Sequence, residues 1–180
     1  MKILTLFFAL LFSTFAHANS LDLAKQDGVI LLMRHAIAPG GGDPSNFTLN
    51  DCSTQRNLSD AGREQARATG KMLRDAGVEI DLVATSQWCR CRETAQLLDL
   101  GEPQDWPSLN SFFGNRSREP EQTRETLEKL KALPAGTTAM LVTHQVNITA
   151  LTNVVPRSGE IIMVRVVDGE LELVGMIAPR

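Results

Sequence analysis

The chain has 180 residues, of which 43% are hydrophobic and 22% are charged, and its formal net charge at pH 7 is -3. This length and composition suit a single globular domain with one core, and no repeat, low-complexity tract or linker divides it. The slight acidic excess argues against a nucleic-acid partner, because proteins of that class carry a basic surface.

The amino-terminal residues differ from the rest of the chain. Lys2 is followed by an apolar run at 3–15 and an Ala-x-Ala triplet at 16–18, an order that is typical of a secretory signal peptide. We therefore expect residues 1–18 to be removed and residues 19–180 to form the folded domain, secreted into a bacterial periplasm without a membrane span. A permanent anchor is the alternative, although the run is shorter than the roughly 20 residues that cross a bilayer.

Strands and helices are predicted to alternate along the chain. Apolar runs and period-two patterns predict strands at 30–33, 80–84, 139–143, 160–167 and 170–177. Helical spacing, with Ser59 as the first N-cap, predicts helices at 60–76, 87–98, 120–133 and 148–155. Segments 40–57 and 101–115 are predicted to be loops. The order predicts an α/β fold, a three-layer α/β/α sandwich with a mostly parallel sheet and a C-terminal hairpin over Asp168 and Gly169.

Three cysteines lie after the leader, at Cys52, Cys89 and Cys91. Oxidising compartments favour disulfides, and two cysteines only two positions apart are poorly placed to bond each other. We therefore expect a disulfide between Cys52 and either Cys89 or Cys91. A zinc site and three buried free thiols are the alternatives.

Each of the first three predicted strands ends in a segment that carries a cation. Arg34 and His35 follow the first strand, Arg90 follows the second, and His144 follows the third. Carboxyl ends of parallel strands meet at one edge of a sheet, so these side chains should converge. Guanidinium groups match phosphate oxygens and imidazole can act as a nucleophile, which indicates a phosphoryl site. Solvated strand caps are the alternative for Arg34 and His35.

These segments resemble the motifs of the histidine phosphatase superfamily, which has the phosphoglycerate-mutase-like fold. The family's Arg-His-Gly after a strand is similar to 34–36, where Ala stands in place of Gly, and its Leu-Ser/Thr helix start is similar to 58–66. Its Ser-x-x-x-Arg-x-x-x-Thr-Ala element is similar to 86–95, and its late Val-Thr/Ser-His is similar to 142–144. The four elements occur in the family's order and span most of the chain after the leader.

The resemblance implies a role for each matching residue. His35 would be the nucleophile that becomes phosphohistidine, and Arg34, Arg90 and His144 would hold the phosphoryl oxygens. Arg56, just before the helix start, looks like a phosphate-binding arginine of short family members, with a solvated loop residue as the alternative. No metal and no organic cofactor are implied.

The general acid of the family is missing from its usual places. Asn110 stands where many members have a Glu, and Gln145 stands where another branch has an Asp after the late histidine. An amide cannot donate the proton that a leaving alcohol needs. The substitute carboxyl groups that we consider are Asp51, ranked first, Glu119, ranked second, and then Asp43 and Glu121.

Together these features predict an exported phosphatase that hydrolyses small phosphomonoesters through phosphohistidine. By analogy with the exported branch of the superfamily, its substrates would be phosphorylated sugars of the lipopolysaccharide core. Two alternatives stay open. One is a non-catalytic module that binds phosphate or phosphosugars on the same fold, and the other is an envelope interaction protein that uses Trp88, Trp106 and Phe112.

Overall fold

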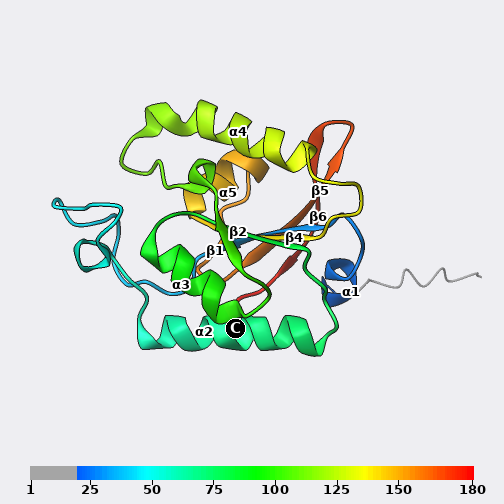
Figure 1. Ribbon diagram of the computed structural model, residues 1–180, viewed down its shortest axis with the longest axis horizontal. Helices are drawn as coiled ribbons and strands as arrows, with labels where there is room; N and C mark the ends of the chain where they lie inside the picture. Colours follow the sequence, from blue (N-terminus) through cyan, green and yellow to red (C-terminus); the bar gives the residue numbers. More distant parts are fainter. Residues whose placement is uncertain (1–19) are drawn as a thin grey trace, which may run out of the picture.

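The computed structural model describes residues 20–180, and the predicted signal peptide at 1–18 lies outside them. A six-stranded sheet forms the middle layer (Figure 1), in the order β3-β2-β4-β1-β5-β6. Strands β1, β2, β3 and β4 are parallel to one another, while β5 is antiparallel to β1 and β6 is antiparallel to β5. The strands are β1 Ile30–Arg34, β2 Leu82–Thr85, β3 Pro103–Asp105, β4 Ala139–Thr143, β5 Ile161–Val167 and β6 Glu170–Ile177.

Helices cover both faces of this sheet (Figure 1), with α2 and α3 on one side and α4 and α5 on the other. The helices are α1 Ser20–Ala24, α2 Asp60–Asp75, α3 Cys89–Leu98, α4 Glu119–Lys131 and α5 Gln145–Thr152. With helices on both faces of the sheet, the predicted three-layer α/β/α sandwich is confirmed. None of these described helices is long and apolar enough to cross a membrane.

The apolar runs of the central strands are continuous because both faces of the sheet are buried. In β1, Leu31 and Met33 pack into the core under α2 and α3, while Ile30 and Leu32 pack into the core under α4 and α5. Strand β1 lies inside the sheet, between β4 and β5, and ends at Arg34. The residues that follow Arg34 therefore lie at the carboxyl ends of the parallel strands.

Local signals fix two of the connections. The Ser59 side chain accepts a hydrogen bond from the Gly62 backbone N–H and caps α2, as predicted. Gly62 also lets α2 approach the segment that follows β1, since a Cβ there would lie 2.1 Å from the Ile37 carbonyl oxygen. At the hairpin, Asp168 and Gly169 both have positive φ, which is the backbone of the tight turn expected for this pair.

Three elements differ from the sequence prediction. Pro103–Asp105 was expected to be a loop but forms the edge strand β3, where the missing proline N–H is tolerated. Helix α5 begins at Gln145, directly after His144, rather than at residue 148. The short helix α1 was not predicted. Each of these stretches is too short or too polar to show a period.

Candidate active site

The strand ends bring the predicted cationic residues together. Arg34 lies opposite Thr143, the residue before His144, in the parallel pairing of β1 with β4. The rings of His35 and His144 meet edge to face with their centroids 5.5 Å apart. Arg90, from the first turn of α3, places Nη2 3.5 Å from His144 Nδ1. The convergence expected from the strand order is therefore present.

His35 is held neutral, with one nitrogen free to react. Its Nδ1 lies 2.8 Å from the Ala36 carbonyl oxygen, so Nδ1 carries the hydrogen and donates it, which leaves the lone pair on Nε2. Burial, followed by the charge of Arg90, lowers the pKa of His35 to about 3. The hydrogen bond to Ala36 opposes this shift, and Arg56 and Arg34 each lower the pKa by a smaller amount. The imidazole is a competent nucleophile over the whole neutral range.

A hydrogen-bond chain fixes the orientation of His144. Because Arg90 faces its Nδ1, we assign the hydrogen to Nε2, which donates to Ser86 Oγ at 2.9 Å. Ser86 Oγ in turn donates to Asn110 Oδ1 at 3.2 Å. Burial, followed by the charge of Arg90, lowers the pKa of His144 well below its ordinary value.

Asn110 is buried and is the last residue in this series of hydrogen bonds. Its Oδ1 also accepts from the Gln87 backbone N–H at 2.8 Å, and its Nδ2 donates to Gln87 Oε1 at 2.9 Å. The amide therefore uses both its donor and its acceptor to shape the segment after β2. Sequence reasoning treated Asn110 only as a lost acid and missed this positioning role, for which a sequence carries no signal.

Two arginines present donors that lack an acceptor. Arg34 donates from Nη1 to the Pro156 carbonyl at 3.0 Å, and Arg90 donates from both Nη atoms to Asp43. The Nε–H of each arginine, however, is buried without a partner. Buried donors normally have a partner, and a bound anion would supply an acceptor for these Nε groups. Burial, and then the positive charge of Arg90, lowers the pKa of Arg34.

Arg56 completes the positive cluster from the loop at 40–57. Its Nε donates to the Gly42 carbonyl at 2.8 Å, and its Nη1 donates to the Ala38 carbonyl. Burial, followed by the charge of Arg90, lowers the pKa of Arg56. The guanidinium thus shapes the loop and adds positive potential, while direct contact with phosphate stays a prediction.

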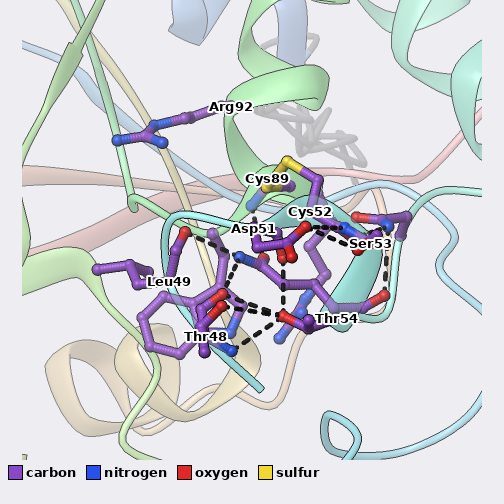
Figure 2. The surroundings of a disulfide bond; sticks show 12 residues. Thr48, Leu49, Asp51, Cys52, Ser53, Thr54, Cys89 and Arg92 are labelled. Atoms are coloured by element: carbon purple, nitrogen blue, oxygen red, sulfur yellow. Dashed lines mark hydrogen bonds between the residues drawn. A yellow bond between two sulfur atoms is a disulfide. The ribbon is translucent and has the colours of Figure 1, made fainter. Parts of the chain in front are cut away.

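The first-ranked acid, Asp51, makes its side-chain contacts within its own loop, and its role as the acid stays a prediction. Its carboxylate accepts from the backbone N–H and the hydroxyl of Ser53, at 2.9 and 2.7 Å (Figure 2). These bonds lower the pKa of Asp51, whereas a general acid needs a raised pKa. Glu119 begins α4 and lies 3.7 Å from Arg116. Its catalytic role stays a prediction.

A disulfide ties the loop to the helix that carries Arg90. Cys52 bonds Cys89, the first residue of α3 (Figure 2), so the predicted pairing is confirmed with Cys89 as the partner. Cys91 is free and buried, and burial raises the pKa of its thiol to about 12. The zinc and free-thiol alternatives are therefore wrong. Over residues 20–180, no cluster of three His, Cys, Asp or Glu side chains is arranged to bind a metal ion.

The aromatic residues do not form the proposed interaction surface. Phe112 is buried at 1% exposure, and the Trp106 ring lies under Lys129. Trp88 belongs to the site instead, since its ring meets His144 edge-on at 5.4 Å and stacks on Phe47 at 5.0 Å. An envelope interaction protein built on these aromatics is not what the structure shows.

Comparisons with known proteins agree with this arrangement. The model of the histidine phosphatase superfamily, branch 1, matches residues 30–116. The mitochondrial serine/threonine-protein phosphatase Pgam5 of Drosophila willistoni is 33% identical over 75 residues, which is 42% of this chain and 23% of that protein. The chain thus spans about a quarter of the length of the curated relatives it matches.

Solved structures show the same fold. The putative phosphohistidine phosphatase SixA from Agrobacterium tumefaciens superposes with a TM-score of 0.60 at 18% identity, covering 85% of this chain and 99% of that chain. Phosphoglycerate mutase from Plasmodium falciparum superposes with a TM-score of 0.54 at 18% identity, covering 82% and 88%. The phosphoglycerate-mutase-like fold is therefore established.

The disulfide yields a prediction about stability. Replacing Cys52 and Cys89 together by Ser opens a loop of sequence separation 37, which should lower the free energy of unfolding by about 3–4 kcal/mol through the restored entropy of the unfolded chain. Urea denaturation of the variant and of wild type measures this loss. Wild type treated with a reductant should match the variant, and equal midpoints for the variant and the oxidised wild type would contradict the prediction.

The lowered histidine pKa values yield a second prediction. The carbon-bound ring protons of His35 and His144, followed by NMR, should not show a titration between pH 8 and pH 5, because burial and the arginines oppose a positive charge on either ring. The assignments come from single substitutions of each histidine. A midpoint near 6.5 for either ring would show that the site does not hold it neutral.

Proposed function

Since the chain belongs to the histidine phosphatase superfamily, we propose that it hydrolyses phosphomonoesters through a phosphohistidine intermediate at His35. The observation that carries the proposal is a neutral imidazole whose Nε2 lone pair is free, set beside arginines with unpartnered Nε–H donors. A phosphoryl dianion supplies acceptors for those donors and offsets the repulsion among the buried cations.

The chemistry divides into two displacements at phosphorus. In the first, the His35 Nε2 lone pair forms the P–N bond while the ester P–O bond breaks, and the leaving oxygen takes up a proton. In the second, a water oxygen attacks phosphorus, the P–N bond breaks, and the electron pair returns to Nε2. The Nδ1–H bond to the Ala36 carbonyl stabilises the positive charge on the phosphorylated ring.

The cations hold the transferring group. Arg34 and Arg90 would donate to the equatorial oxygens, on which negative charge is spread in the transition state, and His144 would lie beside them. Arg56 adds positive potential at the same site. Arg90 and His144 are buried, Arg34 and Arg56 are partly buried, and each makes hydrogen bonds to its neighbours. Little reorganisation is therefore needed when the ester binds.

Export and an envelope substrate are part of the proposal. The leader pattern at 1–18 and a disulfide typical of oxidising compartments support secretion into a periplasm. Phosphorylated sugars of the lipopolysaccharide core are proposed as substrates, on the analogy with the exported branch of the superfamily. A protein phosphoester is the competing substrate class, because the relative Pgam5 is a serine/threonine-protein phosphatase.

A phosphate-binding module without turnover is the second candidate. It is favoured by Asn110, which stands at the usual acid position and has its amide fully engaged. This protein would bind inorganic phosphate and vanadate but would not turn over any ester in a broad panel of phosphomonoesters.

Kinetics of a nucleophile variant test the proposed activity. Purified protein should release phosphate from p-nitrophenyl phosphate, and His35→Ala should lower kcat by more than about a thousandfold because no other group replaces the nucleophile. Near-ultraviolet circular dichroism of the variant controls for folding. Turnover at the wild-type rate in His35→Ala would contradict the mechanism, and binding without turnover in wild type would favour the second candidate.

A further inference from the structure

One carboxylate lies inside the positive cluster. Asp43, in the loop at 40–57, accepts from Arg90 Nη1 at 2.7 Å and from Arg90 Nη2 at 3.1 Å. It also accepts from Trp88 Nε1 at 3.0 Å and from the Arg56 backbone N–H at 3.1 Å. Its side chain is 15% exposed, and within residues 20–180 it forms the one ion pair that reaches an arginine of the site.

The two edges of the Arg90 guanidinium have different surroundings. The end-on edge, formed by Nη1 and Nη2, is bound by Asp43. The side-on edge is formed by Nε and the other hydrogen of Nη2. On this edge Nε is buried without an acceptor, and Nη2 lies 3.5 Å from His144 Nδ1. The side-on edge of Arg90 therefore faces His144, and its Nε–H has no partner.

We infer that Asp43 is a positioning residue, which holds the end-on edge of Arg90 so that its side-on edge presents the unpartnered Nε–H to the phosphoryl group. This inference rests on the proposed phosphoryl site. A long side chain can point in many directions, and a bidentate carboxylate removes that freedom before the ligand arrives. Arg90 thus binds Asp43 and the phosphoryl group at the same time, through different edges.

The charge of Asp43 is fixed by the same contacts. Burial opposes ionisation, but the hydrogen bonds from Arg90, Trp88 and the Arg56 backbone outweigh it and lower the pKa of the carboxyl. Asp43 is therefore an anion in the free protein. It offsets part of the repulsion among the site arginines without taking the donors that face His144.

Asp43 also links the elements around the candidate site. Trp88, which packs on His144, and Arg56, which shapes the loop, both donate to this carboxylate. The Cys52–Cys89 disulfide holds the same loop against the start of α3. Asp43 thus joins the loop after the nucleophile to the helix that carries Arg90.

Binding of inorganic phosphate, measured by titration calorimetry, tests the inference apart from turnover. Asp43→Asn should raise the Kd at least tenfold, because the amide NH2 cannot accept from Arg90 or Trp88 and leaves the guanidinium loosely held. Asp60→Asn, an exposed aspartate paired with Arg63 at the start of α2, is the matched control and should leave the Kd unchanged. Unchanged binding in Asp43→Asn would overturn the inference. Tighter binding would also overturn it, since it would mean that Asp43 competes with phosphate for Arg90.

A double-mutant cycle separates positioning from general support of the fold. If Asp43 acts through Arg90, then Asp43→Asn should have little further effect on phosphate affinity once Arg90 is replaced by Lys, whereas additive losses would refute the inference. Asp43→Glu keeps the charge and changes the reach, so it should also weaken binding; wild-type affinity in this variant would show that only charge matters. Thermal melting identifies any variant that does not fold.

The two proposals fail in different ways. Wild-type protein that binds phosphate but turns over no ester would remove the proposed activity and leave the role of Asp43 intact. Wild-type protein that binds neither phosphate nor vanadate would remove the phosphoryl site and the inference with it.

Discussion

The candidate site depends on positive charge that is buried where the parallel strands β1 and β4 end. Arg90 is 2% exposed, and Arg34 and Arg56 are near enough to lower the pKa of His35 together with it. Placing like charges together away from water is unfavourable unless an anion compensates them. Burial, together with this repulsion, lowers the pKa of both histidines and keeps them neutral. The same surroundings would produce both the affinity for an anion and the reactive state that we propose for His35.

Elements that lie far apart in the sequence hold this cluster of charged side chains in place. Strands β1 and β4 bring His35 and His144 to the same edge, while helix α3 supplies Arg90. The loop at 40–57 is attached to α3 by a disulfide at one point and by the Asp43 carboxylate at another. The site is therefore preorganised by packing, a covalent bond and one buried ion pair.

The sequence predicted those parts of the molecule that local patterns encode. Buried parallel strands have continuous apolar runs, so β1 and β4 were located, and the family motifs then indicated His35, Arg90 and His144 as site residues. Edge strand β3 was missed because three residues carry no period. Asp43 was not ranked above Asp51, since its ion pair spans 47 positions and no local pattern encodes such a partner.

The central claim is that His35 carries the phosphoryl group during turnover. Protein mixed with p-nitrophenyl phosphate and quenched with base within milliseconds, then digested and analysed by mass spectrometry, tests it most directly. The account predicts phosphate on the peptide that contains His35, bound through nitrogen and lost on acid treatment. Steady phosphate release with no label on His35 at any quench time, or label on His144 instead, would contradict it.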